Sequence, residues 1–354
     1  MTIAPEEDIA VAIVGAGSIA AYHVGGLRAA GGTTVAALVG RDPARTGARA
    51  AALGIPRAET RLEAVLDDPA IDAVVIATPD VTHEPFAIAA MEAGKAVLLQ
   101  KPMAMTSAQC RSVLAAQART GARLTVSFMH RYFPEVSWLR GELASGRLGE
   151  VHSIRQRNAT PGADWNEWFF SPQSVAGGVV MQLGVHGIDL LQHVFGPIVS
   201  VQAAMRTARP FRQLTDGRTV ESTLEDNVAA TYGLQSGAMA SHEMCYTERA
   251  GCDRFRLEVY TEAGTIWLRT ERGPAALYAP ALTGKEEWVV PAIEDEPLGA
   301  AHHRHWLAVV RGEAPADGTA EAGLSAQRIA EHVYEAAATR VTLDVAPEPE
   351  LALP

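Results

Sequence analysis

The sequence predicts an α/β protein in which a doubly wound parallel sheet is followed by an α+β domain. Its length of 354 residues is typical of two domains. In the first third of the chain, short β-branched runs alternate with alanine-rich stretches of helical spacing, which is the pattern of βαβ units. After about residue 131 the strands become longer and more polar, with glycine turns between them. We therefore expect one domain over 1–130, a second over 131–345 and a frayed tail over 346–354.

The expected elements follow from apolar periodicity and from the glycines that close helices. In the first domain we expect strands over 9–14, 34–39, 73–77, 96–99 and 124–128. Helices are expected between them, over 20–30, 43–53, 62–66, 85–93 and 107–120. In the second domain we expect strands over 149–157, 227–234 and 256–261, and a helix over 179–194. A helical segment over 300–340, broken near 312–318, is a candidate for packing back on the first domain.

Composition places the chain among ordinary globular proteins, with 48% hydrophobic and 20% charged residues. The net charge of −11, without a concentrated basic run, argues against a nucleic-acid partner. No stretch approaches the roughly 18 uninterrupted apolar residues of a membrane span, and the acidic start has the wrong charge for a signal peptide. We therefore expect a cytoplasmic protein without membrane association. Cys110, Cys245 and Cys252 form no CxxC pair, so neither a disulfide framework nor a thiolate zinc site is expected.

A glycine-rich loop follows the first expected strand and opens the first expected helix. Residues 15–20 have the sequence GAGSIA, a GxGxxA pattern in the strand-to-helix context of a Rossmann domain. Backbone N–H groups and the positive end of the helix dipole would hold a pyrophosphate there. A tight turn without a ligand is the alternative, but the βαβ pattern that follows favours a dinucleotide. Candidate cofactor-binding residues are Gly15, Gly17, Ser18 and Ile19.

The end of the second expected strand selects between NAD and NADP, because a carboxylate there binds the ribose 2′-hydroxyl of NAD and repels the 2′-phosphate of NADP. Here Gly40 is followed by Arg41, whose guanidinium can pair with a phosphate, and Arg45 is a possible helper. Asp42 is the competing candidate, but Asp42 before Pro43 is also a typical helix N-cap. We therefore expect NADP to be favoured over NAD.

Four further stretches resemble motifs of the glucose-fructose oxidoreductase and inositol dehydrogenase family (Gfo/Idh/MocA). Residues 77–83 (ATPDVTH) resemble its TPxxxH, and residues 93–102 (AGKAVLLQKP) are similar to its AGKHVxxEKP. Residues 177–189 (GGVVMQLGVHGID) resemble GGxxxDxGxHxxD, and residues 128–134 (FMHRYFP) resemble the family's domain junction. The likeness implies a Rossmann domain, a second domain with a large mixed, mostly antiparallel sheet, a nicotinamide cofactor, and a homo-oligomer such as a dimer or tetramer.

The resemblance also implies roles for particular side chains. Thr78, Pro79, His83, Gln100 and Lys101 match the cofactor-side motifs. Lys101 would hydrogen-bond the reacting oxygen beside the nicotinamide. The bond from Lys101 to the next residue, a proline, is a candidate cis peptide. The alternative for Lys101 is an ordinary solvated lysine after a strand.

Gln182, His186 and Asp189 are spaced i, i+4 and i+7, which places them on one face of the expected helix. A histidine pKa of about 6.5 suits proton transfer at neutral pH, so His186 is the candidate base and Asp189 its orienting partner. A buried helix histidine with local hydrogen bonds is the alternative. With Lys101, these three residues are the candidate catalytic residues.

Two positions depart from the family pattern, and both lack the carboxylate found there. Gln100 stands where the family has Glu, and Gln182 stands where it has Asp. A glutamine hydrogen-bonds but neither accepts a proton nor carries a charge. Without those negative charges, Lys101 should hold its proton less tightly. The changes either retune the enzyme for another substrate or mark a member that binds without turnover.

Substrate contacts are expected from aromatic and polar side chains. Trp165 and Trp168 offer aromatic faces suited to sugar or cyclitol rings, with core packing as the alternative. The other candidate substrate contacts are Lys101, Arg131, Gln182 and His186. The imidazoles at 302, 303 and 305 lie too close along one helix to face one ion together, so no metal site is expected.

We therefore predict an enzyme that transfers a hydride between NADP and a secondary alcohol of a sugar, cyclitol or sugar acid. One alternative, implied by the family, is an enzyme that retains its cofactor and catalyses epimerisation or elimination. The other is a non-catalytic sensor of dinucleotide and sugar.

Overall fold

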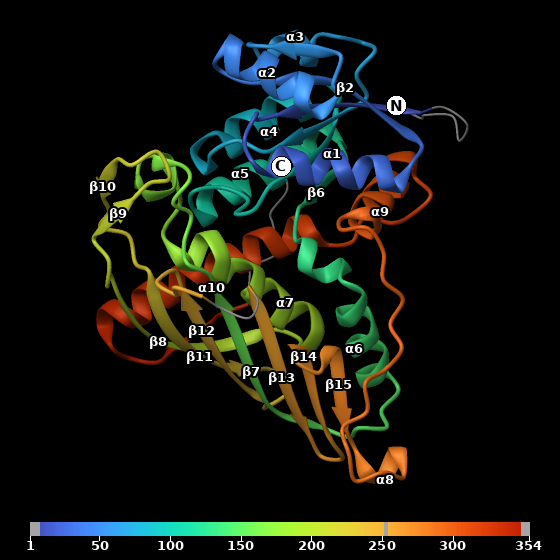
Figure 1. The fold of residues 1–354 in the computed structure, drawn as a ribbon, viewed down its shortest axis with the longest axis vertical. Coiled ribbons are helices and arrows are strands. Elements are labelled where there is room, and N and C mark those ends of the chain that lie inside the picture. Colours follow the sequence, from blue (N-terminus) through green and yellow to red (C-terminus); the bar gives the residue numbers. More distant parts are fainter. Residues whose placement is uncertain (1–7, 251–253, 348–354) are drawn as a thin grey trace. The chain divides into compact units, whose positions relative to one another are not determined.

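The computed structural model describes residues 8–250 and 254–347, so Cys252 and the expected tail from residue 348 on lie outside the described residues. The chain forms two compact units (Figure 1). Unit 1 comprises the described residues up to Tyr132 together with Glu296–Leu324, and unit 2 comprises Phe133–Asp295 and the described residues from Ser325 on. The sequence predicts 296–324 within the second domain but makes the helices over 300–340 a candidate for packing back on the first, and the structure places 296–324 in unit 1.

Unit 1 contains a parallel sheet with the strand order β3-β2-β1-β4-β5-β6. Its strands are β1 (Ile9–Val14), β2 (Thr33–Val39), β3 (Arg57–Glu59), β4 (Ala73–Ile76), β5 (Ala96–Leu99) and β6 (Leu124–Val126). Its helices are α1 (Ile19–Ala30), α2 (Pro43–Leu53), α3 (Glu63–Leu66), η1 (Asp80–Thr82), α4 (His83–Glu92), α5 (Ser107–Thr120), η2 (Met129–Tyr132) and α9 (Ala300–Arg311). The order confirms the doubly wound fold and reverses between β1 and β4, where such sheets bind their ligands. Strand β3 was missed because it is a short, partly exposed edge strand.

One face of the unit 1 sheet is covered by α1, α2 and α9. Val11 and Ile13 of β1 share a buried cluster with Val24 and Leu27 of α1 and with Trp306 of α9. The Trp306 side chain is fully buried, and α9 lies beside α1 in Figure 1. Burial of this apolar surface explains why a helix from the C-terminal part of the chain belongs to unit 1.

Unit 2 is built on a mixed sheet with the order β15-β14-β13-β7-β12-β11-β8-β16. These strands are β7 (Val151–Ala159), β8 (Ile198–Arg206), β11 (Asn227–Leu234), β12 (Met239–Cys245), β13 (Phe255–Thr261), β14 (Thr265–Thr270), β15 (Gly273–Tyr278) and β16 (Leu343–Asp344), and a separate hairpin is formed by β9 (Phe211–Gln213) and β10 (Thr219–Glu221). The helices are α6 (Pro134–Ala144), η3 (Glu167–Phe170), η4 (Val180–Gly184), α7 (Val185–Phe195), α8 (Pro280–Thr283) and α10 (Thr319–Thr339), of which α10 begins in unit 1. Strands β7 and β12 pair in parallel and the other neighbours are antiparallel, which confirms the expected mixed, mostly antiparallel sheet.

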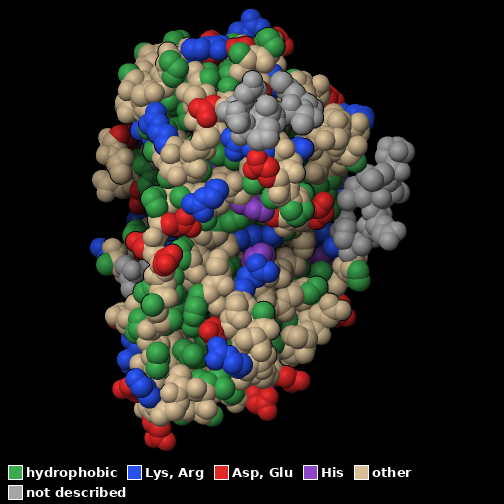
Figure 2. Space-filling view, turned by 90° about the vertical axis from the view of Figure 1, so that its right-hand side faces the viewer, with side chains coloured by type: hydrophobic (Ala, Val, Ile, Leu, Met, Phe, Trp, Pro, Cys, Tyr) green, Lys and Arg blue, Asp and Glu red, His purple; other side chains and the backbone are tan. Residues whose placement is uncertain are grey.

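Side chains along β11 and β12 alternate between buried and exposed, as in an antiparallel sheet with one covered face. Helices α7 and α10 lie on the covered face (Figure 1). On the face drawn in Figure 2, Lys and Arg side chains are interspersed with Asp and Glu, so the described residues form no continuous basic surface there. Within the described part of the chain, no helix is long and apolar enough to cross a membrane.

Candidate active site

The glycine loop of unit 1 lies at the carboxyl end of β1, where the strand order reverses. Gly15 has φ of +121°, and a Cβ atom there would lie 2.2 Å from the carbonyl oxygen of Ala77, so only glycine fits. A Cβ on Gly17 would meet nothing within 4 Å, so no contact inside the chain explains that glycine. Ser18 makes no side-chain cap hydrogen bond to α1, which Ile19 opens. This open approach to a helix N-terminus fits the pyrophosphate of a dinucleotide.

The end of β2 meets the same loop. A Cβ on Gly40 would lie 2.4 Å from Thr46 Oγ1 and 3.0 Å from the Ala16 side chain, so packing alone requires a small residue there. Asp42 caps α2, because its Oδ1 accepts a 2.8 Å hydrogen bond from the N–H of Arg45. The structural interpretation of Asp42 as an N-cap is therefore confirmed.

The arginines near β2 differ in their surroundings. Arg41 and Arg45 are exposed. Arg49, on α2, reaches the glycine loop, where its Nη2 lies 3.4 Å from the Gly17 carbonyl oxygen and 3.5 Å from that of Ser18. The sequence did not single out Arg49, because only the packing of α2 brings it to the loop.

The loops after β4 and β5 are joined by His83. Its Nδ1 lies 2.7 Å from the Pro102 carbonyl oxygen, and its Nε2 lies 2.9 Å from that of Thr78. The Thr82 hydroxyl bonds Thr78 Oγ1 and the Pro79 carbonyl oxygen, each at 2.7 Å. His83 is thus a buried link between two loops.

Gln100 and Lys101 follow β5, and the bond from Lys101 to Pro102 is cis, as expected. The Gln100 side chain is buried. Its Nε2 contacts His23 Nε2 at 2.7 Å and Ser127 Oγ at 3.1 Å. Neither partner was expected from the sequence.

In unit 2, the residues expected on one helix occupy two kinds of helical turn. Gln182 lies in a π-helical turn, η4, whereas His186 and Asp189 lie in α7. All three side chains are buried, with exposures of 6%, 6% and 1%. The expected single helix over 179–194 was therefore wrong at its start, and π turns are frequent at functional sites.

Glu225 holds the start of this π turn. Its carboxylate accepts hydrogen bonds from the N–H groups of Gly178 (3.1 Å) and Val180 (3.0 Å). The Tyr334 hydroxyl donates to the same carboxylate at 2.8 Å. Burial raises the pKa of Glu225, and these three hydrogen bonds oppose the rise. A Cβ on Gly177 would lie 2.0 Å from the Tyr334 hydroxyl, which explains the first glycine of the Gly-Gly pair.

Helix α7 rests on a polar cluster of the sheet. Asn158 Oδ1 accepts hydrogen bonds from Gln156 Nε2 and from His242 Nε2, each at 2.9 Å. A Cβ on Gly187 would lie 1.8 Å from Gln156 Nε2, so the glycine between His186 and Asp189 allows this close approach. The cluster thereby sets the depth of the helix on the sheet.

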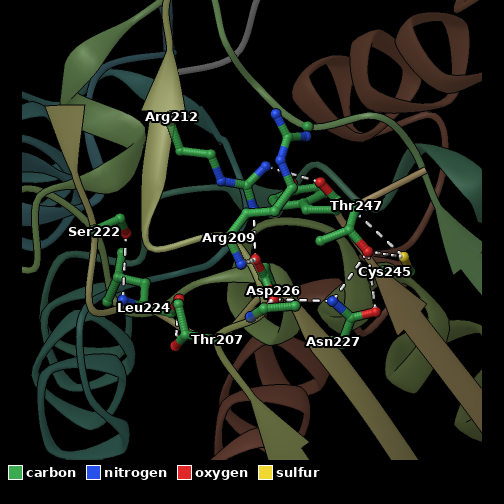
Figure 3. A network of polar contacts seen from close by, with 12 residues as sticks. Thr207, Arg209, Arg212, Ser222, Leu224, Asp226, Asn227, Cys245 and Thr247 are labelled. Atoms are coloured by element: carbon green, nitrogen blue, oxygen red, sulfur yellow. Dashed lines mark hydrogen bonds and ion pairs between the residues drawn. The ribbon is translucent and has the colours of Figure 1, made fainter. Parts of the chain in front are cut away.

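The two tryptophans of the expected aromatic segment differ in exposure. Trp165 is 45% exposed, which excludes core packing, whereas Trp168 stacks on Phe169 with ring centres 3.8 Å apart. The Arg212 guanidinium lies 5.5 Å from the ring centre of Phe170 and forms a buried ion pair of 2.9 Å with Asp226 (Figure 3).

Asp226 also accepts hydrogen bonds from the backbone that follows β8. Its carboxylate accepts hydrogen bonds from the N–H groups of Ala208 (2.7 Å) and Arg209 (2.8 Å), while Arg212 donates to the Tyr246 carbonyl oxygen at 2.9 Å.

Arg131, an expected substrate contact, lies in unit 1, where its guanidinium lies 5.7 Å from the ring centre of Phe128.

Two family descriptions match most of the chain. Residues 9–128 match "Oxidoreductase family, NAD-binding Rossmann fold", and residues 136–267 match "GFO/IDH/MocA C-terminal domain". The chain belongs to the Gfo/Idh/MocA family of oxidoreductases. This confirms the resemblance seen in the motifs, and it makes the chain an enzyme whose Rossmann domain binds a nicotinamide dinucleotide.

Named relatives within the family act on sugars and cyclitols. Inositol 2-dehydrogenase 2 of Saccharopolyspora erythraea is 29% identical over 97% of this chain and 98% of its own length. A 1,5-anhydro-D-fructose reductase of Ensifer adhaerens is 28% identical over 76% of this chain and 85% of its own length. A solved structure of levoglucosan dehydrogenase with NADH and L-sorbose shares the fold, with a TM-score of 0.84 at 21% identity over 96% of this chain and 99% of that one.

Several side chains of this Gfo/Idh/MocA member became visible only in the structure. They are His23 and His303 beside Gln100, Arg49 at the glycine loop, and the pair Glu225 and Tyr334 at the π turn. The Gly-Gly pair was the one local signal, since adjacent glycines indicate that something approaches the backbone closely. Their partners lie far away in the sequence, so no motif could identify them.

Proposed function

We propose that this enzyme transfers a hydride between NADP and a secondary alcohol of a sugar, cyclitol or sugar acid. Two observations together support this proposal best. The glycine loop leaves an open approach for a dinucleotide at Gly17, and full-length relatives are inositol dehydrogenases.

We assign the proton chemistry to two side chains. When bound, the nicotinamide supplies the hydride acceptor or donor. Lys101 hydrogen-bonds the reacting oxygen, and His186 takes the hydroxyl proton during oxidation. Asp189 orients the imidazole, and Gln182 positions a substrate hydroxyl, because an amide cannot act as a base. Thr78 and Pro79 line the cofactor beside the loop that His83 fixes, and Trp165, Trp168 and Arg131 contact the sugar.

The first test is the absorbance of reduced nicotinamide while the purified enzyme meets NAD, NADP and their reduced forms with a panel of sugars, inositols and sugar acids. A net change with one cofactor and one substrate is expected. Lys101→Ala and His186→Ala should each depress turnover by about 100-fold or more. Near-normal turnover of either variant would remove that residue from the mechanism.

The preference for NADP rests on Arg41, because Asp42 is engaged as a helix cap. Arg41→Asp should lower catalytic efficiency with NADP more than with NAD. His152→Gln, on the exposed start of β7, serves as a control that should leave both unchanged. A wild-type enzyme that is more efficient with NAD would refute the preference. The homo-oligomeric assembly and the cytoplasmic location stay predictions.

A further inference from the structure

A buried chain of hydrogen bonds runs through unit 1 to Gln100. His303 Nδ1 lies 2.7 Å from the Gly299 carbonyl oxygen. His303 Nε2 lies 2.9 Å from His23 Nδ1, and His23 Nε2 lies 2.7 Å from Gln100 Nε2. The second hydrogen of that amide is directed to Ser127 Oγ at 3.1 Å. Both imidazoles are fully buried.

Gly299 sets the direction of every bond in the chain. Its carbonyl oxygen can only accept, so His303 carries its proton on Nδ1 and presents a lone pair on Nε2. His23 must then donate from Nδ1, which leaves its Nε2 as an acceptor. Gln100 therefore donates from its amide nitrogen. With both hydrogens of that amide used, the carbonyl oxygen Oε1 is the polar atom that Gln100 can still offer.

The packing around the two rings is built for this arrangement. A Cβ on Gly26 would lie 2.2 Å from His303 Nδ1, so α1 has a glycine where the ring enters. The ring of Tyr22 contacts both imidazoles, at 5.2 and 5.4 Å between centres, and the ring of His302 lies 4.8 Å from that of His303. Burial lowers the pKa of His303 to about 4 and holds that of His23 well below its usual range. These surroundings favour two uncharged rings.

We propose that His23 and His303 are positioning residues that present Gln100 to its neighbour Lys101 as an uncharged hydrogen-bond acceptor. The chain explains why glutamine stands here in place of the family's glutamate. A carboxylate cannot donate, so an ionised glutamate at this position would require one more proton on the two rings, and hence a buried imidazolium at His23 or His303. The inference builds on the proposed role of Lys101.

The decisive measurement is nitrogen-15 NMR of the histidine side chains in the full-length protein. His23 and His303 should both be uncharged Nδ1–H tautomers from about pH 5.5 to 8, whereas free histidine prefers the Nε2–H form and titrates at about 6.5. In Gln100→Glu, one of the two rings should carry protons on both nitrogens. His332 is the matched control, because its Nδ1 lies 2.7 Å from the Arg328 carbonyl oxygen on α10, and its signal should stay unchanged. Two uncharged rings in Gln100→Glu would overturn the proposal, as would Nε2–H tautomers in the wild type.

Kinetics test the link to Lys101. His303→Phe removes the acceptor for His23 and should lower kcat by about 2- to 30-fold, the range of indirect coupling, with a changed pH profile. His303→Gln keeps an acceptor oxygen and should restore part of the loss. Equal turnover of wild type and His303→Phe would contradict the positioning role. If Lys101→Ala turns over normally while the tautomers are as expected, the proposed function fails and the hydrogen-bond chain stands.

Discussion

Two adjacent glycines of α1 offer a sharp test of the packing that holds the histidine chain. Gly25 is exposed, and a Cβ atom there would meet nothing within 4 Å. Gly26 is buried, and a Cβ there would lie 2.2 Å from His303 Nδ1, 2.6 Å from its Cε1 and 3.0 Å from the Gly299 carbonyl oxygen. Because the ring is held by hydrogen bonds at both nitrogens, it cannot move without breaking one of them.

The magnitude follows from these distances. Gly26→Ala should cost about 1–3 kcal/mol for overpacking and about 1–3 kcal/mol for a buried polar group left unpaired, offset by about 1 kcal/mol of helix propensity. The net loss is therefore about 1–5 kcal/mol. Gly25→Ala has the propensity gain alone, about 0.5–1 kcal/mol. Urea unfolding, followed by circular dichroism, compares the two variants with wild type. If Gly26→Ala unfolds at the same urea concentration as Gly25→Ala or a higher one, the close packing of α1 against His303 is wrong.

Two further predictions concern unit 2. Arg212→Met should destabilise the protein by about 3–5 kcal/mol, because it leaves the Asp226 carboxylate charged and buried. Arg218→Met, which removes two exposed ion pairs, should change stability by less than about 1 kcal/mol. Equal losses in urea unfolding would contradict this. Burial lowers the pKa of His242 to about 3 in the folded protein. Below about pH 6.5 the unfolded chain therefore binds a proton at this histidine that the folded chain does not bind, so the free energy of unfolding decreases as the pH falls. His242→Gln should make the free energy of unfolding depend less steeply on pH below about 6.5, whereas His152→Gln should not. Identical pH dependence in the two variants would argue against a neutral, buried His242.

The parallel sheet of unit 1 could be predicted because its signals are local. Strand β1 was expected over the same residues that form it, and Gly54 closes α2 with φ of +62° as a C-cap glycine does. In unit 2 the sequence indicated three of the longer strands, and α6 and the other strands were missed. These strands alternate in burial, but buried polar and exposed apolar side chains blur the pattern in the sequence, as at His242 and Met239 of β12. The partners of the strands also lie far away along the chain.

The candidate site divides in the same way. The motifs identified Lys101, Gln182, His186 and Asp189 as candidates, because residue type and spacing are properties of the chain itself. The π turn at Gln182 was beyond them, since it depends on the Glu225 carboxylate that holds the turn's first N–H groups.

By itself, the sequence determined the βαβ order, the dinucleotide loop and the family, since each is encoded in periodicity and short motifs. The tertiary structure settled two questions that the sequence had left open, whether α9 packs on the first domain and whether Asp42 caps a helix. It alone showed that Gln100 faces a chain of two buried histidines. The physical reason is burial. A hydrogen bond or an apolar contact between residues far apart in the chain forms only when folding removes both partners from water, and no local pattern records which partners will meet.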